Sequence, residues 1–193
     1  LGYEQAVVYD RVLRFEERDK LMKILYYVYL LDVYMAVANV AKERGFVFAK
    51  AHPNDKNMLV MKGMFHPFLT KPVGNTIAVD ENSNVIFLTG ANMAGKSTFM
   101  KTFGITVFLA HVGFPVPAKE MEFSVQNGMF TTINLPDNLS MGYSHFYAEV
   151  LRVKKVAQQV RQTQHLIVVF DELFRGTNVK DAYDATVAVT EAF

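Results

Sequence analysis

The sequence predicts an α/β domain with a mostly parallel β-sheet flanked by helices, preceded by an N-terminal helical segment. Short, wholly apolar runs such as "NVIFLT" (84–89) and "HLIVVF" (165–170) are typical of strands that are buried on both faces. These runs alternate with helical patterns, and strands that are joined by helices pair in parallel. We therefore expect a sheet that is covered by helices on both sides.

The composition limits the classes of protein to consider. The chain has 193 residues, of which 51% are hydrophobic, enough to bury a sizeable core. Twenty basic residues against 19 acidic ones give a net charge of +1, so the chain as a whole lacks the basic excess of a nucleic-acid-binding domain. The chain has no cysteine and begins with no signal-peptide pattern, which predicts a cytoplasmic location.

The N-terminal segment, residues 1–50, is predicted to be helical and separate from a second domain at 51–193. Residues 10–44 contain neither Gly nor Pro, and Gly45 marks the end of the helix. The middle of this helix is apolar on nearly all sides, which predicts packing against protein on several faces. Polar residues interrupt the apolar run, so no membrane span is expected. These residues are Lys23, Asp32 and Asn39.

The second domain begins with loops and short strands and continues as a β-α-β series. Apolar runs bounded by Gly and Pro predict the strands, and longer periodic patterns predict the helices. The predicted strands are Met58–Met61, Thr76–Val79, residues 84–89, one or two within 121–133, and residues 165–170. The predicted helices are Lys96–Val112, residues 145–164 and residues 179–193.

The segment "GANMAGKS" (90–97) matches the pattern G-x-x-x-x-G-K-S/T between a predicted strand and a predicted helix. Gly90 and Gly95 allow backbone angles and close approaches that a Cβ would block. Successive backbone N–H groups can then surround phosphate oxygens at a helix N-terminus, whose dipole favours an anion. Lys96 is expected to reach the β- and γ-phosphates, and Ser97 to ligate Mg²⁺. The pattern predicts a P-loop NTPase that binds ATP.

A second apolar strand ends in two carboxylates, at "LIVVFDE". Asp171 is expected to hold the Mg²⁺, and Glu172 to orient or deprotonate the water that attacks the γ-phosphate. Two adjacent carboxylates favour hydrolysis over binding alone, because a protein that only carries nucleotide needs just the first.

Four ordered motifs resemble the MutS family of DNA mismatch repair ATPases. "TGANMAGKSTFMKT" resembles the Walker A segment of the family, and "LAHVGFPVPA" the helix end and turn that follow it. "DNLSMGYSHFYAEV" is similar to the family's signature segment, and "VVFDELFRGTNVKDA" to its Walker B and following loop. The resemblance covers roughly residues 20–193.

The resemblance implies an ABC-type ATPase that works as a homodimer, with each ATP held between the phosphate loop of one subunit and the signature segment of the other. It implies that Asn92 senses the γ-phosphate or the attacking water, and that Ser144 reaches the γ-phosphate from the partner. The implied nucleotide-binding residues are Gly90, Ala91, Asn92, Met93, Ala94, Gly95, Lys96, Ser97, Thr98 and, in trans, Ser144. The signature positions that match the family are Gly142, Ser144, Phe146 and Glu149.

The chain departs from the family pattern at several positions, as a divergent bacterial relative would. Ala91 and Ala94 stand where the family has Pro and Gly, and His145 where it has Thr. Phe174 replaces the glycine after the acidic pair, so we expect a constrained backbone beside Glu172. Val73 stands where the family stacks adenine on an aromatic residue, so no residue is assigned to that role.

The resemblance also places several parts of the family outside this chain. A histidine switch is expected beyond Walker B, and DNA-contacting domains and C-terminal dimerisation helices are expected elsewhere in the protein. Turnover by residues 1–193 alone is therefore expected to be slow or absent.

Three functions stay open at this point. The first is an ATPase domain that couples ATP binding and hydrolysis to movement of a DNA clamp. The second is a transporter ATPase, which "MGYSHF" does not favour because it differs from the L-S-G-G-Q type of signature. The third is a nucleotide-gated dimerisation module without turnover, which the residues at 145 and 174 motivate.

Overall fold

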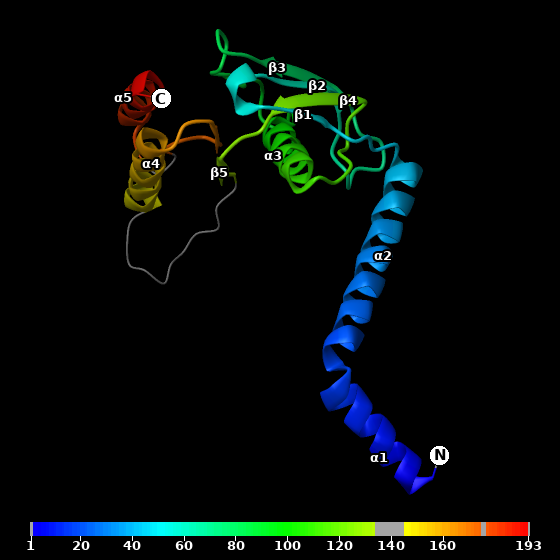
Figure 1. Ribbon diagram of the computed structural model, residues 1–193. Helices are drawn as coiled ribbons and strands as arrows, with labels where there is room; N and C mark the ends of the chain where they lie inside the picture. The colour runs from blue at the N-terminus through cyan, green and yellow to red at the C-terminus, as the bar shows by residue number, and fades with distance from the viewer. Residues whose placement is uncertain (1, 134–144, 175–176, 193) are drawn as a thin grey trace. The chain divides into compact units, whose positions relative to one another are not determined.

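The computed structural model describes residues 2–133, 146–174 and 177–192, together with the backbone alone at residue 145. The chain divides into two compact units, Leu1–Arg44 and Gly45–Phe193, which are described separately below. Figure 1 shows the helical first unit in blue and the mixed α/β second unit in cyan to red. The α/β class predicted from the sequence is confirmed.

The described residues of the first unit are almost all helical, with Gly2 and Glu17 as the exceptions. Helix α1 (Tyr3–Arg11) leads into a π-helical turn (Val12–Glu16), and α2 (Arg18–Arg44) follows. The π-helical turn breaks the single helix predicted for residues 10–44, and helical structure also begins earlier than predicted. Gly45 follows α2 with φ +69°, a left-handed conformation that glycine adopts without steric cost.

Helix α2 is more exposed than its composition predicts. Among the described residues of this unit, none is buried, so the expected packing on several faces is not present within the unit. By length and composition alone, α2 is apolar enough to cross a membrane, with a mean hydropathy of 1.5. Core helices of soluble proteins also meet that criterion, so the absence of a membrane span stays a prediction.

A four-stranded mixed sheet forms the first half of the second unit. Its strands are β1 (Lys50–His52), β2 (Leu59–Met64), β3 (Asn75–Val79) and β4 (Glu120–Ser124), and their order is β1-β4-β2-β3. Strand β1 is parallel to β4, whereas β2 is antiparallel to both β4 and β3. A short 3-10 helix (Asn54–Lys56) separates β1 from β2.

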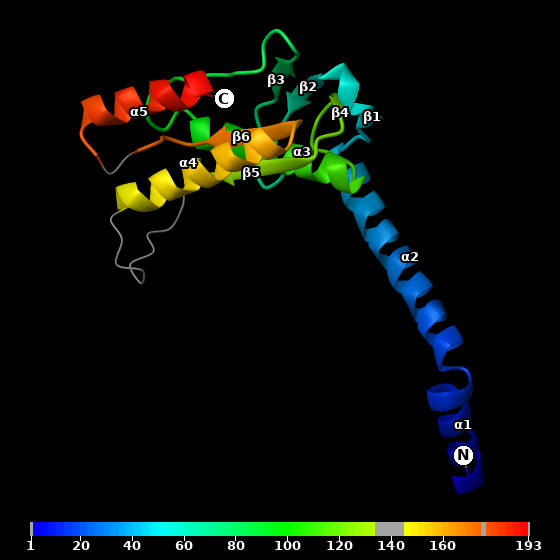
Figure 2. The same ribbon diagram turned by 60° about the vertical axis from the view of Figure 1, so that its left-hand side comes forward.

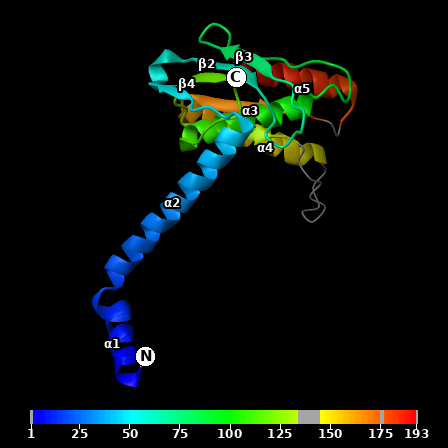
Figure 3. The ribbon, with the colours of Figure 1, turned by 90° about the vertical axis from the view of Figure 1, so that its right-hand side faces the viewer.

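Helix α3 (Lys96–Val112) packs beneath this sheet, as Figure 3 shows, and supplies much of the core. Met61, Met121 and Val107 are buried in this core to an exposed fraction of 2% or less. Two buried threonines of the helix are satisfied locally, since Thr102 and Thr106 each donate a hydrogen bond of 2.7 Å to the carbonyl one turn earlier. Helix α3 thereby connects the loop at its N-terminus to the core of the unit.

A separate two-stranded sheet carries the second half of the unit. Strands β5 (Gly128–Thr132) and β6 (Leu166–Phe170) are parallel, and α4 (His145–Gln162) lies between them in the sequence (Figure 2). Side chains of both strands pack against the core around α3. Helix α5 (Val179–Ala192) ends the described chain.

The sheet prediction needs two corrections. The four-stranded sheet is mixed rather than mostly parallel, because β2 and β3 are joined by residues 65–74 alone, too short a connection for a helical crossover. Helix α3 covers one face of this sheet, while the other face carries charged side chains such as those of Lys62 and Glu120. The expectation of a sheet covered on both faces is therefore wrong for these four strands.

The strand predicted at residues 84–89 is also absent. These residues have no regular secondary structure, and Val85, Ile86 and Phe87 are each about half exposed or more. An apolar run predicts burial, but a strand also needs a neighbour for its backbone N–H and C=O groups. Within the part of the chain that the structure describes, no strand pairs with this run.

Candidate functional site

The predicted phosphate loop leads directly into α3. Its residues 90–95 are exposed, and the backbone N–H of Ala94 donates to the carbonyl of Ala91 at 3.2 Å. Gly95 precedes the helix with φ +94°, and a Cβ built there would meet no atom within 4 Å. The position therefore requires glycine for its backbone angle and not for space.

The first turn of α3 presents backbone donors to this loop. The N–H of Phe99 closes the turn by donating to the carbonyl of Gly95 at 2.8 Å. The preceding N–H groups, at Lys96, Ser97 and Thr98, have no acceptor within the helix by its geometry. Together with the helix dipole, they make this end of α3 suitable for an anion.

The side chain of Lys96 lies across the loop. Its Nζ donates to the carbonyl oxygens of Gly90, at 2.7 Å, and of Ala91, at 3.0 Å. Two neutral carbonyls are weaker partners for an ammonium than the oxygens of a phosphate would be. The lysine side chain is thus held at the loop by two backbone carbonyls.

Ser97 and Asp171 are in direct contact. Ser97 Oγ donates to Asp171 Oδ2 at 2.9 Å, although the two residues belong to different segments of the chain. The end of β5 holds the backbone of Asp171 in place, because its N–H donates to the carbonyl of Thr132 at 3.2 Å. The carboxylate that follows β6 therefore contacts the start of α3. This contact places two oxygen atoms of the kind that ligate hard metal ions side by side.

The turn after Asp171 has an unusual backbone. Glu172 has φ +46° and Phe174 has φ +62°, and both lie in the left-handed region that favours glycine. The Phe174 side chain is 3% exposed, and its ring centroid lies 5.8 Å from that of Phe146 on α4. The sequence comparison anticipated a constraint at Phe174, and the positive φ is the geometry that a glycine there would accept freely.

The remaining predicted residues are placed as follows. Asn92 and Met93 are exposed in the loop, and Met93 has φ +65°. Thr98 is exposed on the first turn of α3, and its carbonyl accepts the Thr102 hydroxyl. Glu149 is half-buried on α4. Gly142 and Ser144 lie outside the described residues, as does the side chain of His145.

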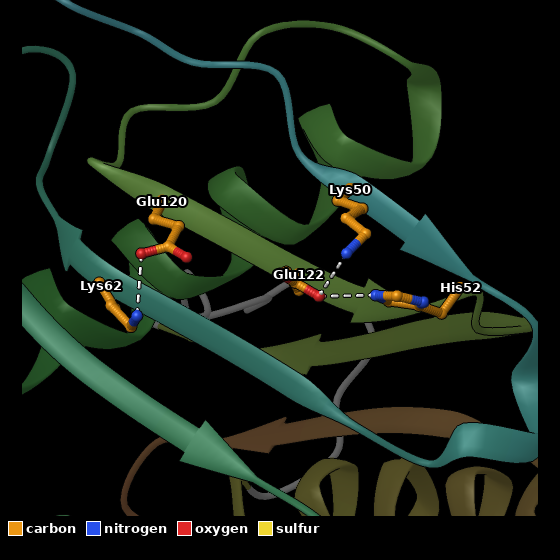
Figure 4. A network of polar contacts seen from close by, with 5 residues as sticks. All are labelled: Lys50, His52, Lys62, Glu120 and Glu122. Atoms are coloured by element: carbon orange, nitrogen blue, oxygen red, sulfur yellow. Dashed lines mark hydrogen bonds and ion pairs between the residues drawn. The ribbon is translucent and has the colours of Figure 1, made fainter.

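A charged cluster on the four-stranded sheet was not anticipated from the sequence (Figure 4). Glu122 Oε2 lies 2.7 Å from His52 Nε2 and 3.3 Å from Lys50 Nζ, while Lys62 Nζ lies 2.9 Å from Glu120 Oε2. The hydrogen bond with His52, followed by that with Lys50, lowers the pKa of Glu122. The hydrogen bond with Glu120 raises the pKa of Lys62.

The alternation of charged and apolar residues along β4 is the sequence signal from which this cluster could have been predicted. Glu120 and Glu122 alternate with the buried Met121 and Phe123, so both carboxylates face away from the core. Their partners lie on neighbouring strands whose pairing the sequence does not specify. The cluster consists of cross-strand ion pairs on an exposed face, and its arrangement is that of a sheet-stabilising network.

Fold and site geometry together define an α/β domain in which a glycine-containing loop, a helix N-terminus and a strand-ending carboxylate meet. The model of the family described as MutS domain V matches residues 86–193, more than half of the chain. The chain belongs to the MutS family.

Individual relatives agree with this assignment. The chain is 32% identical over 179 residues to the DNA mismatch repair protein MutS of Fusobacterium nucleatum, a match that covers 90% of this chain and 20% of that protein. The chain is 31% identical over 196 residues to the protein of the same name from Persephonella marina, a match that covers 97% of this chain and 22% of that protein. The chain is 34% identical over 168 residues to the protein of the same name from Brevibacillus brevis, a match that covers 83% of this chain and 19% of that protein. The chain thus spans about a fifth of the length of these relatives.

Proposed function

We propose that this chain is the ATP-binding and ATP-hydrolysing domain of a MutS-family DNA mismatch repair protein, with the P-loop type of nucleotide site. The observation that carries the proposal is the 2.9 Å hydrogen bond between Ser97 and Asp171. These are the two residues that the motifs assign to Mg²⁺, and the fold brings them together from separate segments. Membership of the MutS family supports the same function.

Phosphate binding is assigned to the loop and to the first turn of α3. Backbone N–H groups from Lys96 to Thr98 supply donors at a helix N-terminus, and the Lys96 ammonium supplies the charge. Lys96 exchanges its two carbonyl partners for phosphate oxygens when the nucleotide binds. Asn92 lies in the same loop and is assigned to sensing the γ-phosphate.

The donor set at Ser97 and Asp171 fits Mg²⁺. The ion prefers oxygen ligands and is usually held by one or two protein groups together with nucleotide phosphates. When bound, the ion would neutralise charge on the phosphate oxygens. Glu172, next to Asp171, is assigned as the base for the attacking water.

The partners follow from the family and are part of the proposal. The relatives named as DNA mismatch repair proteins are about five times as long as this chain, so DNA contacts are assigned to other parts of the protein. A second copy is proposed to complete each ATP site, with Ser144 contributed in trans. A cytoplasmic location fits this role.

Nucleotide binding is tested with Lys96→Ala in the whole protein. Loss of a charge-assisted contact is worth about 1.5–3 kcal/mol, so affinity for a fluorescent ATP analogue is expected to fall about 10- to 100-fold. Lys101→Ala is the matched control, because Lys101 is an exposed lysine on the same helix. Equal affinity in the two variants would refute the assignment of the loop.

Hydrolysis is tested separately with Glu172→Gln. The variant is expected to bind ATP as the wild type does but to lose at least about 100-fold in phosphate release, the usual scale for a general base. If the wild type binds ATP and releases no phosphate in the presence of its DNA and partner subunit, the chain is a nucleotide-gated dimerisation module instead.

A further inference from the structure

Phe174, in the turn that follows β6, combines a left-handed backbone conformation with a buried side chain. Its φ of +62° is one that bulky residues rarely adopt, yet its side chain is only 3% exposed. A residue stays in such a conformation only where its surroundings hold it, and such residues cluster at functional sites. Burial of the Phe174 ring is one contact that favours this conformation of the turn.

The partner of that ring lies on the first turn of another element. Phe146 follows the first residue of α4, and its ring centroid is 5.8 Å from that of Phe174, with the planes tilted by 55°. Tilted aromatic pairs at this separation are favourable contacts. The contact therefore connects the start of α4 to the turn that contains Glu172.

Glu172 lies between two fixed points. On one side, Asp171 is fixed by its N–H donating to Thr132 and by its carboxylate accepting from Ser97. On the other side, Phe174 is buried, and its carbonyl accepts the N–H of Thr177 at 3.4 Å. Glu172 itself has φ +46°, so the direction of its side chain depends on both anchors.

We infer that Phe174 is a positioning residue that orients Glu172 through its contact with Phe146, so that the start of α4 controls the acidic turn. The inference rests on the proposed function of Glu172 in hydrolysis. A change at the first turn of α4 shifts Phe174, and the strained backbone transmits the shift to Glu172. Ser97 and Asp171 are held by separate hydrogen bonds, so nucleotide binding is not affected.

The first test measures the turn without relying on turnover. In the whole protein, Phe146→Ala is expected to speed hydrogen–deuterium exchange of a peptide containing residues 171–174 about tenfold. Val156→Ala is the matched control, because Val156 is buried to 4% exposure on the same helix, farther along it. Unchanged exchange in Phe146→Ala, or an equal increase in Val156→Ala, overturns the inference.

The second test separates positioning from folding and from binding. Phe174→Ala and Phe146→Ala are each expected to lower kcat for ATP about tenfold while KM stays within twofold, and the double variant to lose no more than either single one. Phe174→Leu keeps an apolar anchor that preserves the fold, and it is expected to retain more than half of kcat. Additive losses, or an equal loss of kcat in Val156→Ala, overturn the inference.

The two proposals fail in different ways. If the wild type binds ATP without turnover, the proposed hydrolytic function is wrong. The hydrogen–deuterium exchange experiment then still decides whether the contact between Phe174 and Phe146 holds the turn. Conversely, normal turnover in Phe146→Ala removes the positioning role and leaves the ATPase function standing.

Discussion

The two glycines at the ends of α3 provide a matched test of the phosphate loop. Gly95 precedes the helix with φ +94°, and Gly113 follows it with φ +82°. A Cβ at either position would meet no atom within 4 Å, so an alanine at either one is opposed by the backbone angle alone. An L-residue in the left-handed region costs about 1–2 kcal/mol, so Gly95→Ala and Gly113→Ala are each expected to lower the free energy of unfolding by about that amount.

The two substitutions are expected to differ in nucleotide affinity. Alanine at 95 shifts the backbone N–H groups that face the phosphate, and loss of one charge-assisted hydrogen bond weakens binding about tenfold or more. Alanine at 113 disturbs only the helix C-terminus, where the N–H of Phe114 donates to the carbonyl of Leu109 at 2.9 Å.

The measurements are urea denaturation for stability and titration with a fluorescent ATP analogue for affinity. Equal affinities for Gly95→Ala and Gly113→Ala would refute the reasoning that the N-terminus of α3 binds the phosphate. Wild-type stability in both variants would refute the argument from the backbone angle.

Two further predictions concern the core and the charged sheet face. Met61→Ala is expected to lower the free energy of unfolding by about 2–5 kcal/mol, because Met61 is fully buried, whereas Met93→Ala, at a fully exposed side chain, should change it by less than about 0.5 kcal/mol in urea denaturation. The pKa of Glu122 is lowered below its ordinary value of 4.5, so its stabilising contribution is present above pH 4.5 and is lost as the pH falls through the lowered pKa. Glu122→Gln should therefore destabilise the protein at neutral pH and flatten its acid denaturation curve; parallel wild-type and variant curves would contradict this assignment.

Local patterns predicted the helices of the second unit well. Helix α3 runs from Lys96 to Val112 as predicted, because Gly95 and Gly113 terminate it at both ends. The strands within 59–64, 75–79 and 166–170 also lie where apolar runs bounded by Gly and Pro predicted them. Among the described elements of this unit, β1 and the short 3-10 helix were not predicted individually, since three-residue elements carry no measurable periodicity.

Pairing between strands was predicted less well. The run 84–89 is apolar enough for a buried strand but has no strand partner among the described residues. The mixed order β1-β4-β2-β3 depends on contacts between segments far apart in the sequence, which periodicity does not encode.

The candidate site shows the same difference between features that local sequence predicts and features that depend on tertiary contacts. Amino-acid types and their spacing were enough to propose the loop at 90–97 and the carboxylates at 171 and 172 as a site, because glycine, lysine, hydroxyl and carboxylate groups are the ones that phosphate and Mg²⁺ chemistry requires. That Ser97 touches Asp171, and that Phe174 is buried against Phe146, was decided by the tertiary structure. Local sequence sets the conformations available to a segment, whereas contacts between distant segments form only when the core brings α3, β6 and α4 together.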